Sequence, residues 1–392
     1  MSRITPLARI DEPAPAPAPR GFALFALGFR PFYLLAALAA AVSIGLWTVA
    51  LFGAGWNGYL APLLWHQHEM VFGFALAVIA GFLLTAGRVW TGLATPAGLP
   101  LALLALHWFA ARVLLYTGPG PLAALVDGAF PFVLAAVMAR VIVGSRNVRN
   151  YFVVVLLCAL GAANLAFHLG YGAWAVKAAL YLVLALVLVM AGRVVPAFTA
   201  SALPRAGVVR RPNLDYFSVG ASVAAFVCDL MQWNLAAALF AIAAAAAHGV
   251  RQWGWRPLAT RGSPILWILH LSHAWFPLGF LLLSLSALGL IAPNAALHAF
   301  GAGAMGGLII GMITRTALGH TGRPLAAGRA ETLAYVLVHL AVVLRVVAAL
   351  APGFGYEALI VASAACWASA FLVYFAAYLP RLAQPRIDGK PG

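Results

Sequence analysis

The sequence is poor in charge, and above all in negative charge. Only 8% of its 392 residues are charged, with nine Asp and Glu against 24 Lys and Arg. A typical soluble domain has about 25% charged and roughly 45–50% apolar residues, whereas this chain is 64% hydrophobic. This composition excludes an ordinary soluble enzyme. Apolar runs of about 20 residues, long enough to cross a hydrocarbon core of roughly 30 Å, follow one another along nearly the whole chain.

Cysteine is also scarce. Cys158, Cys228 and Cys366 all fall within apolar runs and form no CxxC or CxxCH pattern. A disulfide framework and covalently attached haem c are therefore not indicated. A β-barrel is not indicated either, because its strands would give short alternating segments instead of uninterrupted apolar blocks. We predict an all-α protein, a polytopic bundle of transmembrane helices.

The apolar runs predict about twelve spans, and the basic residues predict their orientation. Arginines gather in every second loop, and the loops between them carry almost none. Since basic loops face the cytoplasm, both termini are predicted to be cytoplasmic. The net charge of +15 then reflects the membrane topology, and a nucleic-acid partner is not expected. We expect one twelve-helix domain, 31–380, between a disordered Pro/Ala-rich tail, 1–30, and a short basic tail, 381–392. The expected spans are roughly 32–52, 66–86, 99–117, 121–143, 151–170, 173–192, 215–233, 235–252, 264–290, 293–313, 331–350 and 357–379.

Histidines are unusually frequent, because the ten of them outnumber the acidic residues. Ionisable side chains at membrane depth are costly and commonly functional, and histidine is the commonest metal ligand. Imidazoles that converge from different helices at one depth are typical of a haem or copper site. On the predicted topology, four histidines from three helices lie at the periplasmic side and are candidate metal ligands: His66, His68, His168 and His298. Glu69, Asp127 and Asn164 are the candidate side chains that would orient these ligands by hydrogen bonds.

The segment HQHEM, residues 66–70, opens the second predicted span. In a regular helix His66 shares a face with Glu69 and Met70, while His68 points roughly the opposite way. The two histidines then cannot both bind one metal, but they could serve two centres. The alternative is that both lie at the membrane interface, bonded to water or to the helix N-terminus.

Two further groups are candidates on residue type. His270 and His273 share a face of the ninth span and are the next candidate metal ligands; the alternative is that they pack the bundle, bonded across helices. Arg315, His320 and Arg323, in TRTALGHTGRPL, are a candidate cytoplasmic site for an anion such as a haem propionate. The alternative there is a basic loop that meets anionic lipid.

Six motifs spread over most of the chain point to a known family. They are LGFRPFYLLAA (27–37), WHQHEMVFGFALAVIAGFLLTA (65–86), RNVRNYF (146–152), GRVVPAFT (192–199), LHLSHAWFPLG (269–279) and MITRTALGHTGRPL (312–325). On these motifs the chain resembles the NnrS family, haem- and copper-containing integral membrane proteins associated with nitric-oxide stress and denitrification in bacteria. One departure is Arg88 in GRVWTG, where the family usually has a small neutral loop. It leaves the candidate metal residues untouched.

The resemblance implies a multi-pass protein of the bacterial cytoplasmic (inner) membrane that binds haem and copper and protects against nitric oxide or nitrosative stress. Its surroundings would be the lipid bilayer, its ligand nitric oxide, and its partner a respiratory-chain protein; no particular reaction is implied. Two other functions stay open. One is a proton-coupled secondary transporter in which His66, His68, Glu69 and Asp127 relay protons. The other is an accessory or assembly protein of a respiratory complex.

Overall fold

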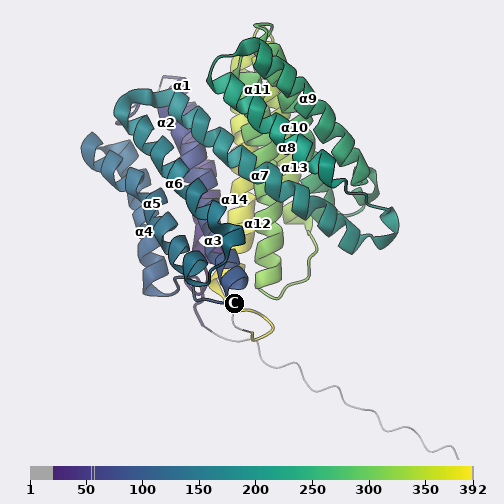
Figure 1. The fold of residues 1–392 in the computed structure, drawn as a ribbon. Coiled ribbons are helices and arrows are strands. Elements are labelled where there is room, and N and C mark those ends of the chain that lie inside the picture. Colours follow the sequence, from purple (N-terminus) through teal and green to yellow (C-terminus); the bar gives the residue numbers. More distant parts are fainter. Residues whose placement is uncertain (1–20, 54, 57, 391–392) are drawn as a thin grey trace, which may run out of the picture.

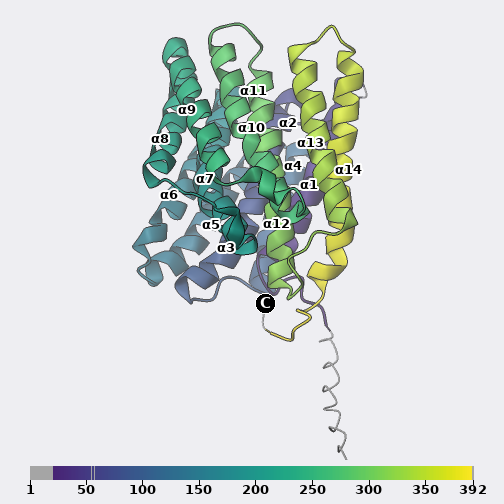
Figure 2. The same cartoon turned by 90° about the vertical axis from the view of Figure 1, so that its right-hand side faces the viewer.

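The computed structural model describes residues 21–390 apart from 54 and 57, and every regular element in this part of the chain is a helix (Figure 1). The predicted all-α class is therefore confirmed. The predicted N-terminal tail lies outside the described residues as far as residue 20, and α1 (Phe29–Leu51) begins within its last two residues. The long helices run side by side as one bundle, and the C-terminus lies at one end of it (Figure 2).

The remaining elements follow in chain order. They are α2 (Pro62–His68), η1 (Glu69–Ala75), α3 (Leu76–Thr91), α4 (Leu99–Thr117), α5 (Gly120–Gly144), η2 (Val148–Asn150), α6 (Tyr151–Ala166), η3 (Phe167–Tyr171), α7 (Gly172–Ala202), η4 (Pro204–Ala206), α8 (Pro212–Leu230), α9 (Asn234–Gly254), η5 (Pro257–Thr260), α10 (Pro264–Ala287), α11 (Asn294–His298), η6 (Ala299–Gly306), α12 (Gly307–His320), α13 (Arg329–Leu350) and α14 (Tyr356–Ala383).

Ten helical segments of the described chain are long and apolar enough to cross a membrane, which supports a multi-pass membrane protein. This count does not confirm the predicted twelve. Two predicted spans, 151–170 and 173–192, fall within a single 55-residue segment, Val148–Ala202, and the predicted span 215–233 falls on α8, which is outside the ten. Helical geometry is interrupted inside the long segment at Gly170, whose φ of +103° suits glycine. Twelve spans and cytoplasmic termini stay predictions.

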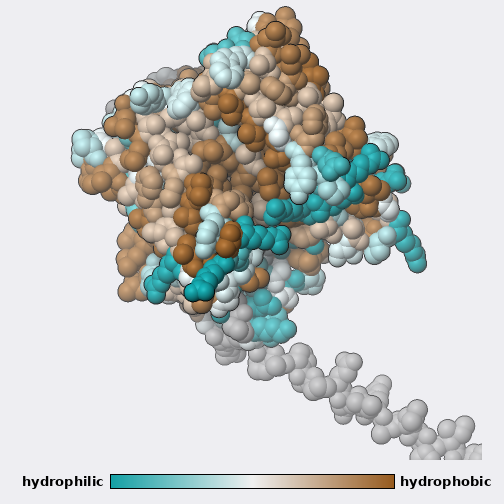
Figure 3. All heavy atoms as spheres, in the orientation of Figure 1, coloured by the Kyte–Doolittle hydropathy of each residue, from teal (hydrophilic) through white to brown (hydrophobic). Residues whose placement is uncertain are grey.

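The outer surface of the bundle suits lipid. Leu103, Leu106 and Phe109 on α4 are 55%, 57% and 47% exposed, and other helices present similar apolar faces. On the face drawn in Figure 3, hydrophobic residues cover most of the surface, and strongly hydrophilic residues gather in a band across its lower half. Contiguous apolar surface of this extent is rare on soluble monomers, and contact with lipid chains explains it.

Three of the ten segments contain a π-helical stretch; η3 lies where the long segment is interrupted at Gly170, and the other two, η1 and η6, each lie inside a single span. The span that begins with α2 passes through η1 into α3, and the span that begins with α11 passes through η6 into α12. A π-helix bonds i→i+5 and so has a wider turn than an α-helix; such segments are frequent at functional sites. Helix α7 packs against η1 and η6. The candidate sites lie around these two segments.

Candidate metal and cofactor sites

The motif HQHEM lies at the junction of α2 and η1, and this junction separates its two histidines. His66 lines a large cavity together with Met70, whereas His68 and Glu69 belong to a separate polar network. The prediction that the two histidines point in different directions is confirmed. Of the face predicted to hold His66, Glu69 and Met70, His66 and Met70 line the cavity, whereas Glu69 lies in the network beside His68.

The cavity has a volume of about 760 Å³ and lies between α1, α2, η1, α7, α11, η6, α13 and α14. It is toward the end of the bundle opposite the C-terminus (Figure 2). Its walls are mostly apolar, with Trp47, Phe74 and Trp367 among them, and the imidazoles of His66 and His298 face it. A cavity of several hundred Å³ with apolar walls and a few polar groups is typical of a cofactor site.

The hydrogen bonds of the two cavity histidines leave ring nitrogens free. His298 Nδ1 donates to the Asn294 carbonyl oxygen at 2.7 Å, so Nε2 carries the lone pair. His66 is 9% exposed and stacks on Trp47 with 4.5 Å between ring centroids, and its Nδ1 is buried without a hydrogen-bond partner. A histidine whose second nitrogen is held by a carbonyl is the usual form of a metal ligand. His298 therefore fits a haem iron through its free Nε2, and His66 offers a ring nitrogen that no hydrogen bond occupies.

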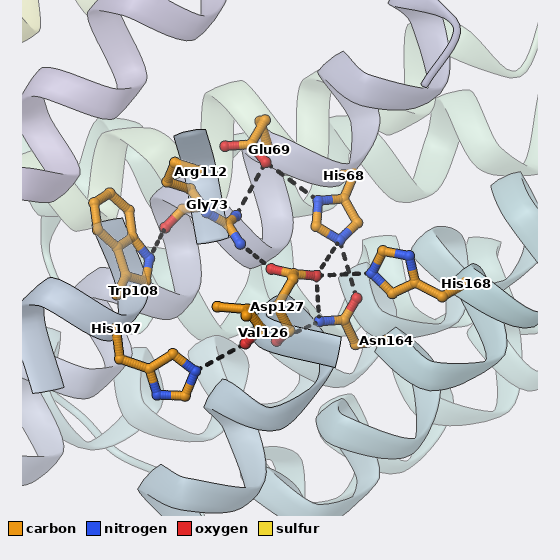
Figure 4. Close-up of polar contacts among 10 residues, drawn as sticks. All are labelled: His68, Glu69, Gly73, His107, Trp108, Arg112, Val126, Asp127, Asn164 and His168. Atoms are coloured by element: carbon orange, nitrogen blue, oxygen red, sulfur yellow. Dashed lines mark hydrogen bonds and ion pairs between the residues drawn. The ribbon is translucent and has the colours of Figure 1, made fainter. Parts of the chain in front are cut away.

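A second site is the polar network drawn in Figure 4, built on two buried carboxylates. Glu69 on η1 and Asp127 on α5 are 2% and 1% exposed. Arg112 on α4 binds both: its Nη1 lies 3.0 Å from Glu69 Oε1, and its Nη2 donates to Asp127 Oδ1. A Cβ at Gly73 would lie 2.7 Å from Glu69 Oε2, so glycine gives the carboxylate its space. Since two carboxylates share one guanidinium, the group carries one surplus negative charge when its histidines are neutral.

Two histidines surround the carboxylate of Asp127. His68 Nε2 and His168 Nε2 each lie 3.0 Å from Asp127 Oδ2. His68 Nδ1 lies 3.3 Å from Glu69 Oε1, while His168 Nδ1 is buried without a partner. The ligand atoms of His68, Asp127 and His168 all lie within 4.8 Å of one another, close enough for one metal ion. A proton on one imidazole or a bound cation would balance the surplus charge, and two nitrogens with one oxygen suit copper or zinc.

Asn164, a candidate for orienting the ligands, belongs to this network, and no described hydrogen bond joins it to His168 on the same helix. Its Oδ1 lies 2.9 Å from His68 Nε2, and its Nδ2 donates to Asp127 Oδ2 at 2.8 Å. Asn164 therefore fixes the positions of His68 and Asp127 relative to each other. The structure thus divides the four predicted ligands into two pairs, His68 with His168 in the network and His66 with His298 at the cavity.

His270 and His273, the next candidate ligands, lie elsewhere on α10. His270 Nε2 lies 2.8 Å from Thr199 Oγ1, and His273 Nδ1 lies 2.8 Å from Gln252 Oε1. Among the residues that the structure describes, one group of three His, Cys, Asp or Glu side chains has metal-ligand spacing, and it does not include these two. Their contacts agree with the alternative of histidines bonded across helices.

The three residues of the predicted cytoplasmic anion site have different neighbours. The Arg315 guanidinium lies 3.8 Å from the ring centroid of Phe198, and the His320 ring lies 5.5 Å from that of Phe29. Arg323 has a buried Nη1 without a partner, and burial together with the nearby Arg381 lowers its pKa. No described contact joins Arg315, His320 and Arg323 to one another. A shared anion site there stays a prediction.

Sequence reasoning did not select three basic residues that the structure places at the sites. Arg112 lies in the network, while Lys177 on α7 and Arg345 on α13 line the cavity. Lys177 is paired with Asp229, to which Tyr181 also donates a hydrogen bond. The available signal was a basic residue inside an apolar span, which is costly without a function or a partner.

Comparison with known proteins agrees with the resemblance of the motifs. No curated protein matches the sequence. A family model described as NnrS protein matches residues 23–386, nearly the whole chain, and this range contains both the cavity and the polar network. The chain therefore belongs to the NnrS family.

Proposed function

We propose that this protein binds haem in the bacterial cytoplasmic membrane and acts in nitric-oxide metabolism or in protection from nitrosative stress. The observation that carries the proposal is the pair of imidazoles, His66 and His298, which face one apolar cavity from two different helices. Membership of the NnrS family supports the link to nitric oxide. A respiratory-chain protein is the proposed partner.

In this proposal His66 and His298 hold the haem iron from α2 and α11. The Asn294 carbonyl keeps the proton of His298 on Nδ1, and stacking on Trp47 fixes the ring of His66. When bound, haem iron supplies binding of small diatomic ligands and one-electron chemistry. The mostly apolar walls match the apolar body of a porphyrin, which would bury its faces there.

The network is the proposed site of copper. His68 and His168 would bind the ion through nitrogen and Asp127 through oxygen, while Glu69 would hold His68 through Nδ1 and Asn164 would hold Asp127. The positive charge of the ion would balance the carboxylate that Arg112 leaves uncompensated. Metal ligands in proteins are commonly oriented by such outer hydrogen bonds.

Alanine at His66, or at His298, is expected to remove most of the haem from the purified protein, because a single remaining imidazole holds the iron less tightly. The measurement is haem per chain by pyridine haemochrome, together with the position of the Soret band. His107→Ala is the matched control, since His107 Nε2 already donates to the Val126 carbonyl oxygen and the residue does not line the cavity. Full haem content with unshifted spectra in both variants would overturn the assignment.

Nitric oxide added to the reduced wild-type protein is expected to shift the haem absorption. Cells that lack the protein are expected to grow more slowly than the parent under nitric-oxide stress. Equal growth of the two strains would contradict the proposed physiological role.

Asp127→Asn is expected to weaken copper binding by on the order of tenfold or more, since changes even outside the ligand set cost about 10–100-fold. Copper per chain is measured after loading and dialysis. Asp229→Asn is the control, because Asp229 pairs with Lys177 outside the network. Equal copper in the wild type and Asp127→Asn would mean that a proton, not a metal ion, balances the network.

A proton-coupled transporter is the second candidate function, and the surplus charge of the network favours it. A proton on His68 or His168 would satisfy Asp127 without any metal. The absorption spectrum separates the two candidates. A Soret band in the purified wild type removes the plain transporter, and a spectrum without one overturns the haem proposal.

A further inference from the structure

Arg345 is a basic residue at the cavity for which the described part of the chain supplies no carboxylate partner. It lies on α13 and lines the cavity, and its Nε and Nη1 atoms are buried with no hydrogen-bond partner. By contrast, Arg112, Lys177 and Arg251 each have a carboxylate partner. Arg345 thus differs from these three basic residues, each of which is paired inside the bundle.

The cavity offers Arg345 no counter-charge of its own. None of the described residues that line it is acidic. A guanidinium keeps its charge in proteins, so it cannot become neutral to avoid the cost of burial. A buried charge without a partner is strongly destabilising. A molecule that enters the cavity can supply the anion that the described lining residues lack.

The shape of the site restricts that molecule. Its apolar walls and volume of about 760 Å³ suit a large apolar body, while the fork of Arg345 suits a carboxylate bound through two parallel hydrogen bonds. A small inorganic anion would leave most of the apolar wall uncovered. An amphiphile with a bulky apolar body and a carboxylate matches both features.

We propose that Arg345 binds the carboxylate of such a ligand, and that the carboxylate is a propionate of the haem held by His66 and His298. The inference rests on the proposed function for the identity of the ligand. It moves the propionate site from Arg315, His320 and Arg323, the cytoplasmic group expected from the sequence, to the cavity itself. Arg345 is a binding residue for the carboxylate and takes no part in iron ligation.

Metal-free porphyrins test Arg345 separately from the histidines, because they carry propionates but no iron for an imidazole to bind. The full chain, produced without haem supply and placed in lipid nanodiscs, is titrated with protoporphyrin IX and with its dimethyl ester. Binding is followed by porphyrin fluorescence against empty nanodiscs. The wild type is expected to prefer the free acid. Arg345→Leu should weaken binding of the free acid by on the order of ten- to hundredfold, as expected for charge-assisted hydrogen bonds, and leave the ester unchanged.

Three further variants show whether the guanidinium of Arg345, and not another basic residue, gives the preference for the free acid. Arg345→Lys keeps the charge without the fork and should fall between the wild type and Arg345→Leu. Arg329→Leu, at the exposed far end of the same helix, should behave as the wild type. Arg315→Leu tests the predicted cytoplasmic site. If Arg315→Leu loses the preference for the free acid and Arg345→Leu keeps it, the inference is overturned.

The outcomes distinguish this inference from the proposed function. Equal binding of both porphyrins by the wild type and Arg345→Leu overturns the role of Arg345, while haem retention by the same wild type still supports the proposed function. Haem retained by both His66→Ala and His298→Ala overturns the assignment of the iron ligands. A preference for the free acid that depends on Arg345 would still support the role of Arg345. A wild type that binds neither porphyrin overturns both.

Discussion

Arg112→Leu is expected to destabilise the folded protein by about 3–5 kcal/mol, the range measured when one partner of a buried ion pair is removed. The change leaves Glu69 and Asp127, which are 2% and 1% exposed, without the guanidinium that binds both. Two uncompensated carboxylates at this depth then repel each other in surroundings of low dielectric constant. Thermal unfolding in detergent, followed by size-exclusion chromatography, measures the loss.

Two comparisons show whether the charge is the cause. Arg140→Leu replaces an exposed arginine on α5 and should unfold as the wild type does. Arg112→Leu combined with Glu69→Gln and Asp127→Asn removes all three charges together and should recover most of the stability, because neutral replacements of a buried ionic group are well tolerated. A triple variant as unstable as Arg112→Leu alone would show that packing, not charge, is the contribution of Arg112.

Gly192→Ala is expected to cost about 3 kcal/mol or more, although it adds one methyl group. A Cβ at this position would overlap Nη2 of Arg251 and lie 2.9 Å from its Cζ. The guanidinium cannot move away freely, because Nε lies 2.6 Å from Asp215 Oδ1 and Nη1 lies 3.4 Å from His248 Nδ1. The added methyl therefore either breaks the buried ion pair or pushes α7 and α9 apart.

The same unfolding measurement includes a glycine control and a second-site control. A Cβ at Gly249, on α9, meets nothing within 4 Å, so Gly249→Ala should be neutral or slightly stabilising through its helix propensity. In an Arg251→Met background Gly192→Ala should cost much less, since residues in contact are not additive. Equal costs in both backgrounds would exclude Arg251 as the cause.

The sequence predicted what depends on hydropathy and charge along the chain. Long apolar runs predicted an all-α bundle, and His66, His68, His168 and His298 were selected because they share one membrane depth. All four lie at the cavity or in the network. Hydropathy predicts the helices because each membrane helix satisfies its backbone N–H and C=O groups within its own segment, so its insertion depends mainly on the sequence of that segment.

The prediction failed where contacts between helices decide the outcome. Asn164 sits one helical turn before His168 on its own helix, yet it bonds His68 and Asp127 from two other elements. Arg112 joins Glu69 to Asp127 across three elements, and no spacing in the sequence encodes that meeting. Glu69 likewise lies with His68 and Arg112 in the network, and its contact with Arg112 comes from another helix.

The π segment η1 also gives this span one residue more than a continuous α-helix would need. A π turn contains about one residue more than an α turn, so loss of a single residue within Glu69–Ala75 would restore a continuous α-helix. Because the wide turn and the α turn both complete a full circle, the residues on either side would keep their faces, with His66 at the cavity and His68 at Asp127. A deletion inside α3 has no wide turn to absorb it and would rotate everything before it by about 100° around the helix axis. The π segment is thus a place in this span where the chain can lose a residue without a change of register at either centre.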